Sequence, residues 1–418
     1  MLKGYVHPNF SSVAGILAKQ LPKDQDGGAA VCIYHRGQCV VDIWGGTRNE
    51  AGDEWEEDTL SLSFSTTKGI ASTLLHICAD RGLIRYDDPV AKYWPEFGQS
   101  GKGAITIRQV MCHEAGLYDI RGMVPHANEM TDWDGMIRRI EQTAPAHHPG
   151  RHNGYHGLTY GWLVGEVVQR VTGKPFAEAL EEMIAGPLNL DGLYVGIPET
   201  VYGRRAYLIK PGGGQGGIEG LGHGKKPKPL AIQLRNRLIR QFIDNMIRIS
   251  GTNPNNIRAG LLPRGISSFD FNGNDVVKSC IPSANGMFTA RSLARVYAAL
   301  ANGGSLDGAR IVSPDRVEQM SEIQNHRRDK VVPIPMKWRL GYHRVFTTGP
   351  RTPHAFGHFG FGGSGAWCDP SRELAVALTL NSGVGTPFGD SRIAYLNSAA
   401  IQAADKLALQ KPSVIPVW

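Results

Sequence analysis

The sequence lacks the features that mark a membrane protein, a zinc ribbon or a redox protein. No segment approaches eighteen unbroken apolar residues, and the first residues contain no apolar leader region. The six cysteines are widely spaced, form no C-x-x-C pair and lie mostly in apolar runs, so we interpret them as reduced core residues. These absences predict a cytoplasmic protein with no membrane attachment.

The positive charge of the chain is not organised for nucleic-acid binding. The net charge is +7, but the lysines and arginines are scattered rather than gathered into stripes with interleaved aromatic residues. The 418 residues suffice for one large domain or two interleaved ones. No heptad pattern or internal repeat indicates an oligomeric state.

Two motifs could suggest a metal or a cofactor, but the residues around each of them do not support such a site. The histidines at 147, 148, 152 and 156 lack both H-E-x-x-H spacing and flanking carboxylates. Residues 211–217 contain G-x-G-x-x-G, but the following Gly/Pro/Lys-rich stretch cannot open a helix. We therefore expect no metal and no cofactor, and interpret 211–229 as a surface insertion. Our hypothesis is that the insertion and a basic helix at 233–249 form a lid over an acyl pocket.

Ser65 and Lys68 stand one helical turn apart where a strand passes into a helix. Ser61 to Phe64 alternates like the end of a strand, and apolar residues then recur at helical spacing as far as Gly82. Lys68 shares a helix face with Ser65, and the helix N-terminus favours developing negative charge. The pattern indicates an activated serine nucleophile. The alternative is a simple serine N-cap beside a solvated lysine.

Further motifs follow Ser65 and Lys68 in a characteristic order. They are Asp87-Asp88-Pro89-Val90, Ile105-Thr106-Ile107-Arg108, His113-Glu114-Ala115-Gly116-Leu117, Tyr155-His156-Gly157 and His358-Phe359-Gly360. Over about residues 25–400 this succession resembles the serine β-lactamase-related superfamily, which includes class C β-lactamases and penicillin-binding proteins. No G-x-S-x-G elbow occurs, which disfavours the α/β-hydrolase class.

The resemblance implies a catalytic role for Tyr155. It takes the tyrosine position of the family's Y-x-N motif, while Gly157 replaces the asparagine. We expect Lys68 and Tyr155 to share the base role toward Ser65, with the lysine ammonium lowering the pKa of the phenol. Which of the two takes the serine proton stays open at this point.

The resemblance also implies an oxyanion hole and a set of substrate contacts. His358-Phe359-Gly360 stands where the family has K-T-G, and Gly360 lets the strand approach the substrate closely. The backbone N–H groups of Ser65 and Phe361 are expected to hold the oxyanion. We also expect the substrate to contact His358, Gly360, His156 and Trp338.

The expected fold is α+β, of the β-lactamase/transpeptidase type, with an antiparallel sheet flanked by helices and an inserted helical domain. Residues 1–75 and 276–418 are expected to form the sheet domain, and 76–275 the helical domain with the Tyr155 motif. The patterns predict a helix at 10–21, a hairpin over 29–44 that turns at Arg36-Gly37, strands at 336–346, 356–368 and 374–380, and a helix at 391–409.

Gly157 and His358 depart from the pattern of an efficient β-lactamase. The departures favour the esterase branch known as family VIII carboxylesterases. The sequence thus predicts a serine hydrolase that cleaves small-molecule carboxylic esters with short to medium acyl chains. Three alternatives remain: a β-lactamase or D,D-peptidase, an acyltransferase of secondary metabolism, and a non-catalytic scaffold.

Overall fold

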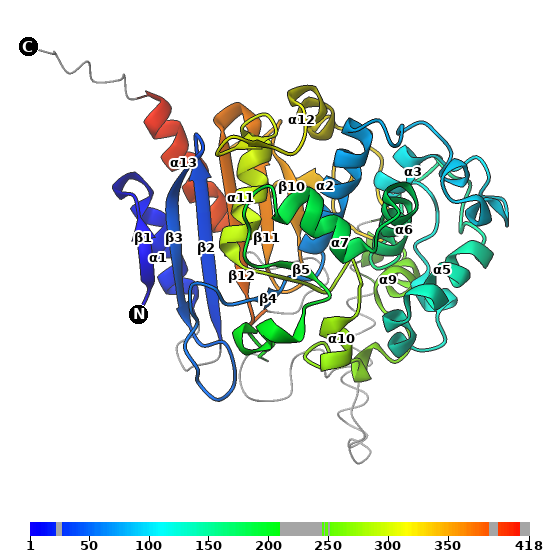
Figure 1. The fold of residues 1–418 in the computed structure, drawn as a ribbon, viewed down its shortest axis with the longest axis horizontal. Coiled ribbons are helices and arrows are strands. Elements are labelled where there is room, and N and C mark those ends of the chain that lie inside the picture. The colour runs from blue at the N-terminus through cyan, green and yellow to red at the C-terminus, as the bar shows by residue number, and fades with distance from the viewer. Residues whose placement is uncertain (22–26, 210–244, 246, 250, 384–391, 410–418) are drawn as a thin grey trace, which may run out of the picture.

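A computed structural model of the chain describes residues 1–21, 27–209, 245, 247–249, 251–383 and 392–409, so the insertion at 211–229 and most of the helix expected at 233–249 lie outside the described residues. Its centre is a seven-stranded antiparallel sheet (Figure 1). In spatial order the strands are β1 (Lys3–Val6), β3 (Gln38–Gly46), β2 (Gly28–His35), β12 (Leu374–Leu380), β11 (Gly365–Asp369), β10 (Phe356–Phe359) and β9 (His343–Arg344). The sheet therefore combines strands from both ends of the chain.

The β2–β3 hairpin illustrates how local sequence sets the sheet. Arg36 and Gly37 both have positive φ values, 52° and 74°, as a two-residue turn between antiparallel strands requires. His35 pairs with Gln38 directly across this turn. On its other side β2 pairs with β12 along seven residues, from Leu374 opposite His35 to Leu380 opposite Ala29. The hairpin therefore brings the N-terminal strands against those from the C-terminal part.

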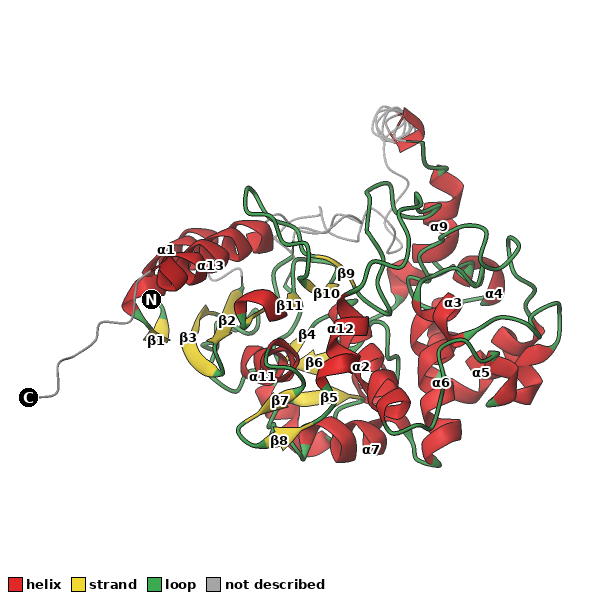
Figure 2. Ribbon diagram, turned by 90° about the horizontal axis from the view of Figure 1, so that it is seen from above, coloured by secondary structure: helices red, strands yellow, loops and turns green. Residues whose placement is uncertain are grey.

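Helices cover both faces of the sheet (Figure 2). On one face, α1 (Ser11–Gln20) and α13 (Arg392–Leu409) pack on each other and on apolar side chains of β2, β3 and β12. On the other face, α11 (Ala290–Ala301) packs on β2, β11 and β12. The helix α2 (Thr66–Asp80) also lies on this face, against β10, and is buried along almost its whole length.

The helical part of the molecule lies beyond α2. α2 contacts α6 (Tyr160–Thr172) over much of its length. The other α-helices among the described residues are α3 (Ile107–Met111), α4 (Ile120–Met123), α5 (Trp133–Gln142), α7 (Phe176–Leu180), α9 (Pro254–Leu261), α10 (Asn274–Lys278) and α12 (Pro314–Ser321). Short strands form two small sheets, β4 (Ser61–Leu62), β6 (Gly286–Phe288) and β5 (Leu193–Val195) in one, β7 (Ser305–Leu306) and β8 (Ala309–Arg310) in the other.

The expected fold class is confirmed, and three details of the expectation need correction. The strand predicted over 356–368 is two strands, β10 and β11, because Gly362 and Gly363 between them take positive φ values of 85° and 108°. Only His343–Arg344 of the strand predicted over 336–346 is a strand, because Lys337 and Gly341 take positive φ values of 50° and 78° that interrupt an extended chain. The domain boundary expected after residue 75 falls inside α2, a continuous buried helix. The division into a sheet part and a helical part otherwise stays a prediction. In the part of the chain that is described, no helix is long and apolar enough to cross a membrane.

Candidate active site

Ser65 occupies the corner between β4 and α2. It is the N-cap residue of α2, but its side chain caps no backbone group and is thus available for other contacts. The residue before it, Phe64, has a φ of 43°, which is uncommon for a bulky side chain. Strain of this kind is concentrated at functional sites. The N-cap alternative of the sequence analysis therefore does not describe the Ser65 hydroxyl.

Lys68 and Tyr155 converge on the Ser65 hydroxyl. Lys68 Nζ lies 2.9 Å from Ser65 Oγ, and the Tyr155 phenol donates a hydrogen bond to the same oxygen at 3.0 Å. Lys68 Nζ also donates to the carbonyl of Ser283 at 2.8 Å and lies 5.2 Å from the centre of the Tyr155 ring. A nucleophile within reach of two proton-transfer groups is the arrangement that activates a serine.

The environment of Lys68 favours an uncharged amine. Its side chain is completely buried, and no carboxylate pairs with it among the described residues. Burial lowers the pKa of Lys68 well below its usual 10.5, because a desolvated ammonium loses its hydration without a compensating charge. An unprotonated amine at 2.9 Å can accept the Ser65 proton.

Tyr155 differs from the sequence-based expectation. We expected the lysine ammonium to lower the pKa of this phenol, but burial raises it above the usual 10.0, and the nearby Asp329 charge acts in the same direction. The expectation was wrong because sequence does not reveal that both groups are desolvated together. The raised pKa keeps the Tyr155 phenol protonated at neutral pH.

Asp329 and Trp338 hold Tyr155 in place. One carboxylate oxygen of Asp329 accepts hydrogen bonds from the backbone N–H groups of Tyr155, Val331 and Val332, at 3.1, 2.7 and 3.0 Å. The other oxygen accepts from Trp338 Nε1 at 3.0 Å. The Trp338 ring stacks on the Tyr155 ring at 5.4 Å, with 14° between the planes. The Asp329 carboxylate therefore holds the Tyr155 backbone directly and the Tyr155 ring through Trp338.

Trp338 and His156 were expected to contact the substrate, and the structure corrects both interpretations. Trp338 is 1% exposed and His156 is fully buried. His156 Nε2 accepts from the Leu117 backbone N–H at 3.0 Å, and its Nδ1 lies 3.3 Å from His113 Nδ1. The His113 ring contacts the Tyr155 ring at 5.0 Å. Both side chains support Tyr155 from behind instead of facing a ligand.

His358 lies on the same side of the site as Tyr155. Its ring stands 6.2 Å from the Tyr155 ring and 4.6 Å from that of His343. Its Nδ1 donates to the Phe359 carbonyl at 3.1 Å, whereas its buried Nε2 has no hydrogen-bond partner among the described residues. Burial lowers the pKa of His358 well below 6.5, so the ring is neutral. A contact between His358 Nε2 and the substrate therefore stays a prediction.

Gly360 brings the end of β10 against the start of α2. A Cβ at this position would lie only 2.3 Å from the Ser63 carbonyl oxygen, so the approach requires glycine. The Phe361 ring packs on the Phe64 ring at 5.5 Å, which places the two segments side by side. Within the described part of the chain, the backbone N–H groups of Ser65 and Phe361 donate no hydrogen bond. Two free donors at this junction suit an oxyanion hole.

Sequence reasoning missed several residues that shape the site. Asp329, Ser283 and His343 lie far from Ser65 in the chain and belong to no recognisable motif, so only the fold brings them together. His343 Nε2 accepts from the Phe359 N–H at 3.2 Å and thereby fixes the strand end beside His358. No signal in the sequence singled out these three positions.

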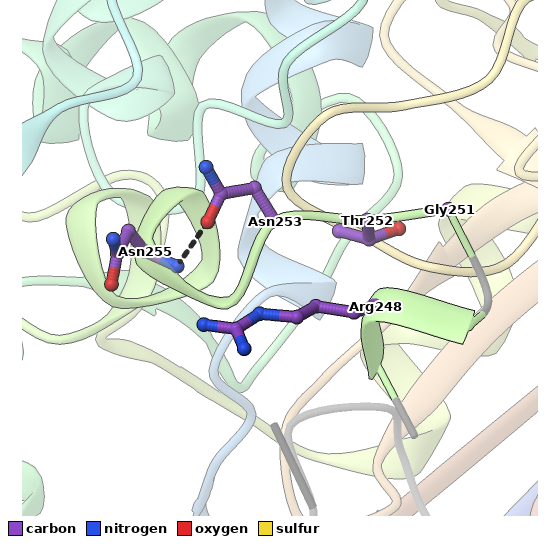
Figure 3. Close-up of a pocket in the computed structure, with 5 residues that line it drawn as sticks. All are labelled: Arg248, Gly251, Thr252, Asn253 and Asn255. Atoms are coloured by element: carbon purple, nitrogen blue, oxygen red, sulfur yellow. Dashed lines mark hydrogen bonds between the residues drawn. The ribbon is translucent and has the colours of Figure 1, made fainter. Parts of the chain in front are cut away.

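A separate hollow of about 470 Å³ lies at the start of α9, and Arg248, Gly251, Thr252, Asn253 and Asn255 line it (Figure 3). Among the described residues, no hydrogen bond joins these side chains to Ser65, Lys68 or Tyr155. The described residues also contain no group of three or more His, Cys, Asp or Glu side chains that could hold a metal.

The fold and the serine–lysine–tyrosine cluster define a serine enzyme of the β-lactamase type. The family described as Beta-lactamase matches residues 16–401, and the chain belongs to this family. It is 37% identical over 383 residues to the esterase/beta-lactamase LipL of Mycobacterium tuberculosis, which covers 90% of this chain and 82% of LipL. A family VIII carboxylesterase structure matches with a TM-score of 0.81 and 30% identity, covering 96% of this chain and all of that one. A penicillin-binding protein homologue from Caulobacter crescentus matches with a TM-score of 0.80 and 31% identity, with the same coverage.

Proposed function

We propose that this protein is a serine hydrolase that cleaves carboxylic esters of short to medium acyl chains through an acyl-Ser65 intermediate. The observation that carries the proposal is the convergence of Lys68 Nζ and the Tyr155 phenol on Ser65 Oγ, at 2.9 and 3.0 Å. The names of its relatives, an esterase/beta-lactamase and a family VIII carboxylesterase, support an ester as the substrate. The partner we propose is therefore a small neutral ester, not a nucleic acid.

Acylation begins with the neutral amine of Lys68. Lys68 takes the proton of Ser65 as Oγ attacks the ester carbonyl carbon, and the carbonyl oxygen becomes an oxyanion. The N–H groups of Ser65 and Phe361 hold this oxyanion. When the tetrahedral intermediate collapses, the bond to the alcohol oxygen breaks and that oxygen takes a proton from Lys68, directly or through the Tyr155 hydroxyl. The acyl group remains on Ser65.

Deacylation repeats these steps with water. A water molecule attacks the acyl-Ser65 carbonyl, gives one proton to Lys68, and the second tetrahedral intermediate releases the carboxylic acid. Ser65 Oγ then recovers a proton from Lys68. Because Tyr155 donates to Oγ in the resting state, it also stabilises the serine oxygen while it is the leaving group. We propose Ser65, Lys68 and Tyr155 as the catalytic residues on this basis.

The decisive experiment compares nitrophenol release from short-chain nitrophenyl esters with hydrolysis of a chromogenic cephalosporin. Both are measured for the wild type, for Ser65→Ala and for Ser100→Ala, a serine on an exposed loop that serves as the control. We expect ester turnover that Ser65→Ala abolishes and Ser100→Ala retains. Cephalosporin hydrolysis that exceeds ester hydrolysis would move the protein to the β-lactamase or peptidase alternative. No turnover of either substrate would overturn the proposal and favour an acyltransferase or a scaffold.

A further inference from the structure

The last turn of α9 lies directly against the loop that carries Tyr155. A Cβ at Gly260, near the end of α9, would meet the side chain of Val331 at 3.0 Å and the Tyr155 carbonyl oxygen at 3.4 Å. The chain beyond α9 is tied to α4, because Arg121 Nη1 donates to the Leu262 carbonyl at 2.8 Å. The position of α9 relative to Tyr155 is therefore fixed from two sides.

This close approach depends on glycine at position 157. A Cβ there would lie 2.3 Å from Leu261 Cδ2 and 2.8 Å from the Gly260 carbonyl oxygen. The same Cβ would be 3.6 Å from Cε1 of the Tyr155 ring. The space beside Tyr155 that a side chain at 157 would otherwise fill is thus occupied by the methyl groups of Leu261.

Leu261 packs beside Tyr155. It packs, partly buried, against a cluster that contains Tyr155 and Trp338, and Ile334 and Phe346 pack on this cluster in the same partly buried way. We call Leu261, Ile334 and Phe346 the hydrocarbon wall. The Leu261 side chain has no polar atom, so a polar group placed against it would lose its hydrogen bonds to water without replacement, whereas at Phe346 the Arg344 guanidinium lies 4.9 Å from the ring centre.

We propose that Leu261 is a specificity-determining residue, and that the hydrocarbon wall selects esters whose chain beside Tyr155 is hydrocarbon rather than amide-bearing. The inference rests on the proposed ester hydrolysis and adds the chemical class of the substrate. A hydrocarbon chain gains contact with Leu261, whereas an amide at the same place is left unpaired. The wild type should prefer the hydrocarbon chain about 10- to 100-fold in kcat/KM.

The test uses two matched pairs of esters. In the first, the acyl chain varies: 4-nitrophenyl pentanoate against the 4-nitrophenyl ester of N-acetylglycine. In the second, the alcohol varies: 4-propylphenyl acetate against 4-acetamidophenyl acetate, followed by titration of the released acid. Each pair is measured with the wild type, Leu261→Asn, Leu261→Ala and Leu261→Met. The control is Leu83→Asn, because Leu83 is an exposed leucine beyond the far end of α2.

In at least one pair we expect Leu261→Asn to reduce the hydrocarbon preference about tenfold, Leu261→Ala to reduce it less, and Leu261→Met to retain it. Leu83→Asn should behave as the wild type. An unchanged preference in both pairs for folded Leu261→Asn and Leu261→Ala, checked by thermal unfolding, would overturn the inference while leaving ester hydrolysis intact. If the wild type cleaved none of the four esters, the proposed function itself would fail.

Discussion

Replacing Lys68 with methionine should remove catalysis and, at neutral pH, stabilise the folded protein. The reason is that Lys68 is completely buried without a carboxylate partner among the described residues. Methionine has a similar length and needs no hydration, so it fills the same space without the cost of burying an ionisable amine. Active sites commonly trade stability for function in this way.

The magnitude follows from two opposing contributions. Each unit by which burial lowers the pKa of Lys68 below its usual value corresponds to about 1.4 kcal/mol of lost stability while the pH lies below the folded-state pKa. Against this, methionine leaves the Ser283 carbonyl without the donor that Lys68 provides at 2.8 Å, which costs about 1 kcal/mol. Because the pKa of Lys68 is lowered well below 10.5, the first contribution is larger. We expect a net stabilisation of about 2 kcal/mol at pH 7.

The direction in which stability changes with pH follows from the lowered pKa of Lys68. Between the lowered folded-state pKa of Lys68 and the usual value of 10.5, the unfolded chain binds more protons than the folded one. The wild type therefore gains stability from this group as the pH rises through that window. Lys68→Met lacks the dependence, so its advantage should be largest below the folded-state pKa and should disappear toward pH 10.5.

The assay is urea unfolding at several values between pH 6 and 10, beside ester hydrolysis at each. Lys102→Met is the matched control, because Lys102 is a buried lysine outside the site that donates to the carbonyls of residues 99, 141 and 143 at 2.9, 2.7 and 2.8 Å. Burial also lowers the pKa of Lys102, to about 8, but three carbonyls lose their donor in this variant, so it should keep its activity and gain less stability at pH 7 than Lys68→Met. If Lys68→Met were less stable than the wild type at pH 7, or its advantage did not fall toward pH 10, Lys68 would not be a buried uncharged amine.

Three further predictions concern the same cluster. Tyr155→Phe should lower kcat about 100-fold or more with little change in KM, and an unchanged kcat would remove Tyr155 from the proton pathway. In the wild type, kcat/KM should rise with pH as Lys68 loses its proton at its lowered pKa, and should not fall again before about pH 10, because burial raises the pKa of Tyr155. Gly157→Ala should lower stability by about 1–3 kcal/mol in urea unfolding, since its Cβ would meet the Gly260 carbonyl and Leu261; wild-type stability would show that α9 is not docked closely.

Structural features that depend on neighbouring residues could be predicted from the sequence. The strand-to-helix corner at Ser65 and the hairpin turn at Arg36-Gly37 depend on neighbouring residues, and both were expected at the right place. The helix expected at 391–409 is confirmed over its described residues, Arg392–Leu409. The overall architecture came from the order of several motifs, since no single element specifies how the two ends of the chain share one sheet.

Features that depend on burial and long-range contact could not be read from the sequence. Asp329 follows Tyr155 by 174 residues, yet its carboxylate holds the Tyr155 backbone. The pKa of Tyr155 was predicted in the wrong direction, because a charged neighbour can be inferred from spacing but joint desolvation cannot. Trp338 was assigned to the substrate for a similar reason: an aromatic residue near a site motif looks the same in sequence whether it faces the ligand or the core.

The electrostatics of the site explain why one departure from the β-lactamase pattern, the histidine at position 358, fits an esterase. Burial lowers the pKa of Lys68, His113, His343 and His358 alike, so it favours the uncharged forms of these four groups. A substrate carboxylate would lose far more hydration there than a neutral ester does. Negative charge then arises only during the reaction, at the oxyanion, where backbone N–H groups are already oriented. A neutral histidine replaces the lysine at position 358. This replacement is consistent with a site whose strongest electrostatic interaction forms only in the transition state, between the backbone N–H groups and the oxyanion.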